Sequence, residues 1–130
     1  MIIESMIPTF DLRIGNWITV SDVIYRVTGV SETKVHFKEH KRAFKQEDLH
    51  PIPITQELLE KAGFKQRGKT NLYDKVPEEG FTYHIYWHKV MIFHAPENTL
   101  CHWLNTRIVF LHQLQNLYYC LTGREIFISF

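Results

Sequence analysis

The sequence predicts a small α+β protein, and three observations lead to that prediction. Short β-prone segments fill the first fifty residues, more of them follow between residues 71 and 104, and one amphipathic helix lies near the C-terminus. A chain of 130 residues can bury one hydrophobic core, or two subdomains that share one. An apolar fraction of 45% and a charged fraction of 22% indicate a globular protein rather than a disordered one.

Residues 1–50 are expected to form an SH3-like small β-barrel. Their β-branched and aromatic residues gather in short segments, and Ser21-Asp22 separates the first two as a hairpin turn. The expected strands lie at 15–20, 23–30, 33–37 and 42–44. Several short strands linked by tight turns are typical of a small barrel or curled sheet.

Residues 51–130 are expected to form a second, α+β subdomain, because Pro51 and Pro53 fix an extended path at its start. Thr55 should cap a short helix over 56–62, which Gly63 ends. An antiparallel meander should follow, with strands at 71–76, 81–88, 90–94 and 100–104.

The last predicted element is a helix over 111–122. Its apolar stripe consists of Leu111, Leu114, Leu117, Tyr118 and Leu121. Gly123 should end the helix, because glycine accepts the left-handed conformation needed just past the last turn. Segments 108–110 and 126–128 look strand-like, so we expect the helix to lie between strands and to cover one face of the C-terminal sheet.

The polar residues of this helix are candidate binding residues. His112, Gln113, Gln115 and Asn116 together offer several hydrogen-bond donors and acceptors, as a recognition face would. A solvated face opposite the leucines explains them equally simply, since every amphipathic helix has a polar side. The solvated face is the preferred interpretation.

Three blocks of the sequence resemble a family of small uncharacterised proteins from gut anaerobic bacteria and their prophages and mobile elements. The blocks are D-L-R-I-G-N-W-I at 11–18, H-P-I-P-I-T-Q-E-L-L-E-K-A-G-F at 50–64 and H-Q-L-Q-N-L-Y-Y-C-L-T-G-R-E-I at 112–126. Tyr119-Cys120 and Ile126 depart from that pattern, but only by aromatic or apolar replacements. The resemblance implies a phage or mobile-element origin; that family has no established activity and supplies no site residues.

A local basic cluster indicates nucleic-acid binding as an alternative function. Fifteen basic and fourteen acidic residues leave a net charge of +1, so the whole chain has no strong field to attract nucleic acid. Basic residues nevertheless gather at 34–45, where Lys34, Lys41, Arg42 and Lys45 are the candidate ligands of phosphate and Phe37 and Phe44 are candidates for stacking. The alternative is a solvated edge whose lysines discourage strand pairing.

The sequence contains no recognisable catalytic, metal or cofactor motif. Five histidines, at positions 84, 88, 94, 102 and 112, crowd the C-terminal half without the spacing of a zinc site. Cys101 and Cys120 are expected to be free and mostly buried. With no glycine-rich phosphate loop, no signal peptide and no apolar run long enough to span a membrane, we expect a cytoplasmic protein without a cofactor.

The preferred function is therefore that of a non-enzymatic accessory protein that binds a protein partner or a second copy of itself. Its many aromatic residues, 14% of the chain, fit such a role because tyrosine and tryptophan are enriched in interfaces. Nucleic-acid binding is the alternative, and a small hydrolase is third.

Overall fold

A computed structural model of the chain describes residues 7–66, 68–69, 72–75, 83–86, 89–94, 102–105 and 108–130. These residues belong to two compact units. The first consists of the chain up to Pro53 together with Phe110–Ile126, and the second of Ile54–Val109 and Phe127–Phe130. The chain passes from the first unit to the second after Pro53, and the C-terminal helix groups with the N-terminal residues rather than with the rest of residues 51–130.

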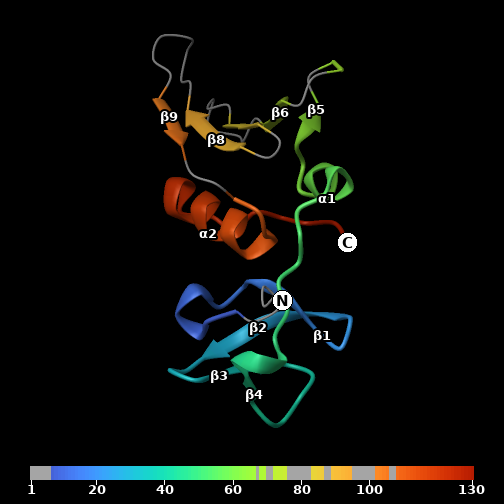
Figure 1. Cartoon of the computed structure of the whole chain (residues 1–130), viewed down its shortest axis with the longest axis vertical. Coiled ribbons are helices and arrows are strands. Elements are labelled where there is room, and N and C mark those ends of the chain that lie inside the picture. The colour runs from blue at the N-terminus through green and yellow to red at the C-terminus, as the bar shows by residue number, and fades with distance from the viewer. Residues whose placement is uncertain are drawn as a thin grey trace, which may run out of the picture. The chain divides into compact units, whose positions relative to one another are not determined.

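The first unit contains a curled, four-stranded antiparallel sheet (Figure 1). Its elements are a 3-10 helix at Thr9–Asp11, strands β1 (Trp17–Val20), β2 (Val23–Val30), β3 (Lys34–Phe37) and β4 (Phe44–Lys45), and a second 3-10 helix at Gln46–Asp48. The strands are hydrogen-bonded in sequence order. The α+β class and the strand-rich start of the chain are confirmed.

The turn between β1 and β2 lies at Ser21-Asp22, as the sequence predicts. Val20 pairs with Val23, so the loop has two residues. Ser21 and Asp22 have φ angles of 50° and 65°. Positive φ at both central residues is the type I′ geometry whose twist matches that of the adjoining strands.

The core of this unit consists of side chains on one face of the sheet, together with residues that precede and follow the sheet in the chain. In β3, Val35 and Phe37 are buried whereas Lys34 and His36 are exposed, which is the period-two pattern of a strand with one covered face. The buried cluster consists of Ile7, Leu12, Ile18, Val27, Val35, Phe37, Phe44 and Leu49.

Helix α2 (Leu111–Thr122) has the predicted bounds. Leu111 and Leu114 are almost completely buried. At its start the Oε1 atom of Gln113 accepts a hydrogen bond from the main-chain N of Phe110 at 3.0 Å. At its end Gly123 is left-handed, with φ of 73°, and donates its N–H to the carbonyl of Tyr119.

The second unit contains a short helix and a five-stranded sheet. Its elements are α1 (Gln56–Lys61), β5 (Lys65–Gln66), β6 (Leu72–Lys75), β7 (Tyr83–Tyr86), β8 (Lys89–His94) and β9 (His102–Asn105). All neighbours in this sheet are antiparallel and follow the order of the chain, so the predicted meander is confirmed. Thr55 caps α1 as predicted, because its side chain accepts from the N–H of Leu58 at 3.1 Å.

The two apolar segments that flank α2 are not strands, contrary to the sequence-based prediction. Phe110 forms only an isolated bridge with Pro53, and residues 126–128 form no ladder. Ile126 and Ile128 are nevertheless buried. Their apolar character therefore reflects burial of an extended chain, which looks the same in sequence as a strand.

Within the described part of the chain, no helix has both the length and the apolar character that crossing a membrane requires.

Candidate functional site

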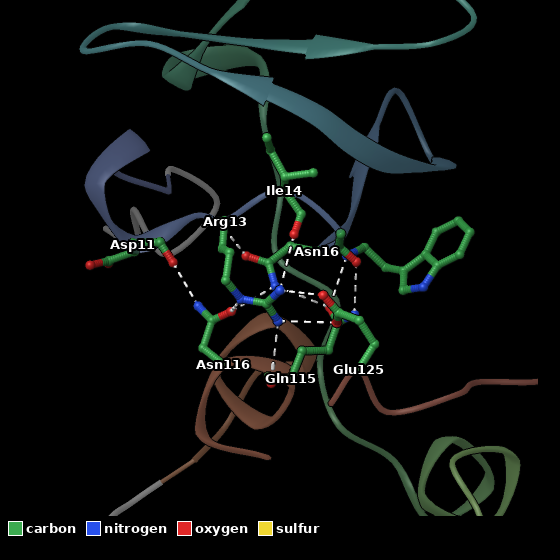
Figure 2. Close-up of polar contacts among 9 residues, drawn as sticks. Asp11, Arg13, Ile14, Asn16, Gln115, Asn116 and Glu125 are labelled. Atoms are coloured by element: carbon green, nitrogen blue, oxygen red, sulfur yellow. Dashed lines mark hydrogen bonds and ion pairs between the residues drawn. The ribbon is translucent and has the colours of Figure 1, made fainter. Parts of the chain in front are cut away.

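A network of polar groups joins the chain before β1 to helix α2 and the residues that follow it (Figure 2). Its long-range hydrogen bonds connect residues 98 to 112 positions apart. On one side it includes Asp11, Arg13, Ile14, Gly15, Asn16 and Trp17, and on the other Gln115, Asn116 and Glu125. We call these nine residues the polar network.

At its centre, the side-chain amide of Gln115 hydrogen-bonds to the main chain on both sides of Asn16. Its Oε1 accepts from the N–H of Trp17 at 2.9 Å, and its Nε2 donates to the carbonyl of Gly15 at 3.0 Å. In an extended chain these two groups point to the same side, where a neighbouring strand would pair with them. Gln115 is only 1% exposed, so its amide stands in for a strand partner inside the protein.

The two asparagines complete the buried part of the polar network. Asn16, which is 0% exposed, accepts from the N–H of Arg13 at 2.7 Å and donates to Oδ1 of Asn116 at 2.8 Å. Asn116 in turn donates to the carbonyl of Asp11 at 3.0 Å. The amide of the buried Asn16 therefore has the partners that it requires, and the half-buried Asn116 connects it to the chain at Asp11.

Arg13 forms the more exposed part of the polar network. Its Nη1 and Nη2 atoms both bond to the carboxylate of Glu125, and its Nε donates to Oδ1 of Asn116 at 3.1 Å. The guanidinium carbon also lies 4.3 Å from the centre of the Tyr119 ring. The bidentate ion pair and the ring together hold the planar guanidinium in one orientation.

Gly15 is the position in the polar network where no other residue fits well. Its φ angle is 101°, which disfavours any residue with a side chain. A Cβ atom added there would lie 2.7 Å from Oε2 of Glu125, the atom that is paired with Arg13. Glycine thus permits both the backbone turn and the ion pair.

His112 is buried in the first turn of α2. It is 4% exposed, its ring stacks on that of Phe110, and its Nδ1 atom has no hydrogen-bond partner. Burial lowers the pKa of His112 from its ordinary value, while the negative charge of Asp11 acts in the opposite direction. Neutral imidazole is therefore the favoured form in the folded protein.

The predicted polar face of α2 is thus neither a uniform solvated surface nor a single recognition face. Gln113 is exposed but is engaged in capping, whereas His112 is buried and the amides of Gln115 and Asn116 bond to the chain before β1. The sequence could not show this, because amides that face water and amides that satisfy a distant main chain have the same spacing along a helix.

Large apolar side chains lie exposed beside the polar network. Phe10 is 87% exposed, Ile14 is 60% exposed and Tyr119 is 42% exposed. Phe10 precedes Asp11 in the sequence, and Ile14, which follows Arg13, is itself part of the polar network. The ring of Tyr119 contacts the guanidinium of Arg13. Phe10 and Ile14 were not singled out from the sequence, because a lone apolar residue gives no sign of its exposure.

The four predicted basic ligands are all exposed. Lys34 and Lys45 lie opposite each other on β3 and β4, and Lys41 and Arg42 lie in the connection between these strands. The stacking part of the nucleic-acid hypothesis is wrong, however, since Phe37 and Phe44 are 2% and 5% exposed. Their rings are part of the core and cannot stack on bases.

No group of three or more histidine, cysteine, aspartate and glutamate side chains suited to a metal is found among the described residues. The register pairs His94 with Tyr83 on one side and with His102 on the other. His88 and Cys101 lie outside the described residues. Cys120 is free, as predicted, but it is exposed rather than buried because it lies on the outer side of α2.

Comparison with known proteins found no protein-family model that matches the chain, and no similar curated protein or solved structure.

Proposed function

We propose that this protein is a non-enzymatic binding module that contacts a protein partner, or a second copy of itself, through Phe10, Ile14 and Tyr119. We call these three side chains the apolar surface. The observation that carries the proposal is the exposure of Phe10 and Ile14, at 87% and 60%. Covering side chains of this size with a partner is worth about 1.5–3 kcal/mol each.

The polar network supports this proposal because it fixes the backbone that displays the apolar surface. The carbonyl of Asp11, next to Phe10, accepts from Asn116, and the carbonyl of Ile14 accepts from Arg13. Tyr119 is held by its contact with the guanidinium of Arg13. Side chains on a backbone that is already ordered lose less entropy on binding, so they contribute more to affinity.

Three finer expectations belong to the same proposal. The curled sheet of four antiparallel strands in sequence order supports an SH3-like barrel for residues 1–50, a fold that serves as a binding module in many settings. The resemblance at 11–18, 50–64 and 112–126 supports a phage or mobile-element origin. A cytoplasmic location is the third of these expectations.

The proposal is tested by the double substitution Phe10→Ser and Ile14→Ser. Both side chains are exposed and no hydrogen bond of the polar network uses them, so the fold should be retained. We expect the double variant to bind its partner at least about 100-fold more weakly than the parent, from the loss of two buried apolar side chains. Sedimentation over a range of concentrations measures self-association, and affinity capture with both forms measures binding of another protein.

Val23→Ser is the matched control, since Val23 is an exposed apolar residue of β2 beside the β1–β2 turn and is not part of the apolar surface. It should leave mass and captured proteins unchanged. If the parent, the double variant and the control all show the same mass and capture the same proteins in equal amounts, the apolar surface is not the binding site.

A further inference from the structure

A second surface of the first unit places two positive charges side by side. Lys34 on β3 is the direct cross-strand partner of Lys45 on β4, and both side chains are exposed. Directly opposed side chains in an antiparallel pair are about 5 Å apart at Cβ, and like charges at that distance destabilise the pairing. Such a pair is more favourable when an anion binds between the two ammonium groups.

Arg42 adds a third cation to this surface. Its guanidinium carbon lies 4.7 Å from the centre of the Phe44 ring, and Phe44 itself is buried between the strands. The ring therefore gives Arg42 a fixed support. A planar guanidinium that is held in place is the side chain best suited to bind the oxygens of a phosphate group.

The three cations line one open hollow of about 550 Å³. Its lining consists of Lys34, Arg42, Ala43, Lys45, Glu47 and Asp48. No ion pair joins any of the three cations to an acidic group among the described residues, although Glu47 and Asp48 lie at the same hollow. The two acids thus reduce the positive charge of the hollow without neutralising its cations individually.

Aromatic packing beneath the hollow holds the connection between β3 and β4 in place. Tyr25 stacks on Phe37 at 5.1 Å between ring centres, and His40 contacts Tyr25 and Phe44 edge-on at 5.1 Å and 5.0 Å. The ring of Phe44 supports Arg42, one of the three cations. Because Phe37 and Phe44 are buried, they offer no face to a nucleobase, so the hollow is suited to a phosphate group rather than to a base.

We propose that the hollow formed by Lys34, Arg42 and Lys45 is a phosphate-binding site, which takes the sugar-phosphate backbone of a nucleic acid without regard to base sequence. This site shares no residue with the apolar surface and does not depend on the proposed protein-binding function. A free phosphate ion offers the same chemistry, so the test includes both sources.

The test is a titration of the whole protein with a single-stranded DNA of random sequence at low and moderate salt, alongside inorganic phosphate at matched ionic strength. Amide NMR shifts at Lys34, Arg42 and Lys45 locate the binding, and fluorescence anisotropy of the DNA gives the affinity. We expect DNA binding that weakens with salt and shifts centred on these three residues. Shifts with inorganic phosphate but none with DNA would show that free phosphate is the ligand and overturn the nucleic-acid assignment.

The substitution Lys34→Glu separates binding from folding. It replaces a repulsive cross-strand pair by an attractive one, so the unit should become slightly more stable while DNA affinity falls about tenfold and the salt slope decreases by about 1. Lys65→Glu changes the net charge equally at an exposed position of the second unit and should have little effect. Equal losses in the two variants would mean that only net charge matters, which would overturn the site.

The acidic residues give a test of opposite sign. Replacing Glu47 and Asp48 by glutamine and asparagine should tighten DNA binding severalfold, because repulsion at the hollow is removed. Unchanged affinity in this variant, or no DNA binding by the parent protein at low salt, would also overturn the proposal.

Discussion

At the scale of single residues, the amide of Gln115 is the group on which the first unit most depends. It accepts a hydrogen bond from the N–H of Trp17 and donates one to the carbonyl of Gly15. Gln115→Met keeps the length of the side chain but removes both hydrogen bonds. Because two buried hydrogen bonds to the main chain would be lost, we expect a loss of roughly 2–4 kcal/mol in the free energy of unfolding.

Urea denaturation followed by circular dichroism measures that loss. Cys120→Ala, an exposed substitution on the same helix, should change the stability little. A Gln115→Met protein as stable as the parent would show that water can replace the side-chain amide there, and would contradict the role assigned to the polar network.

The burial of His112 leads to a prediction of how the stability of the first unit depends on pH. Burial lowers the pKa of His112 in the folded state below its unfolded value of about 6.5. The stability of the folded state associated with a neutral His112 is thus fully present above that unfolded pKa. It decreases as the pH falls below about 6.5, because the unfolded chain then takes up a proton that the folded chain does not, at no more than about 1.4 kcal/mol per pH unit.

The comparison that isolates this effect is His112→Phe, which keeps an aromatic ring next to Phe110 but cannot titrate. Asp11 is the charged group that acts on His112, and it remains in both proteins. Denaturation at pH 7.5 and 5.5 should show a larger loss of stability in the parent than in the variant. Equal losses would mean that the seven other histidines account for the acid sensitivity.

At the scale of elements, the turn between β1 and β2 is not optimal for its geometry. Ser21 and Asp22 both adopt positive φ, a conformation that is energetically unfavourable for most residues that have a side chain. Asn-Gly is the pair preferred in a two-residue turn of this type. Ser21→Asn with Asp22→Gly should therefore raise the free energy of unfolding by about 0.5–1 kcal/mol, measurable as a higher urea midpoint.

Local signals in the sequence predicted most elements, and long-range contacts account for what was missed. The hairpin at Ser21-Asp22, the cap at Thr55 and the stop at Gly123 each depend on a few neighbouring residues, and all three are present. The partner of α2 depends instead on pairs of residues about one hundred positions apart. Periodicity along one helix carries no information on which distant chain its amides satisfy.

At the scale of the whole molecule, the first unit is built from two segments that lie far apart in the sequence, up to Pro53 and from Phe110 to Ile126. The residues of the polar network all come from the segments 11–18 and 112–126. The polar side chains of these segments therefore have a role in folding, whereas the apolar surface that they support remains available for binding. The exposure of that surface could be learned only from the structure.

The candidate basic ligands are all exposed, as lysine and arginine next to alternating apolar residues generally are. Their arrangement was not predictable in detail. The pairing of Lys34 with Lys45 depends on the register of β3 and β4, and the position of Arg42 depends on its contact with Phe44. The sequence shows a basic run, and only the register shows two charges placed opposite each other.

The measurement that tests the central claim most directly is photo-crosslinking from position 10. A photoreactive phenylalanine analogue in place of Phe10, introduced in the cells that make the protein, should form a discrete adduct with a partner or with a second copy, since this side chain is 87% exposed on a fixed backbone. The same analogue at Val23, which is exposed beside the β1–β2 turn, should form none. Adducts that are absent at position 10, or equally abundant and heterogeneous at both positions, would contradict the proposal that the apolar surface binds a protein.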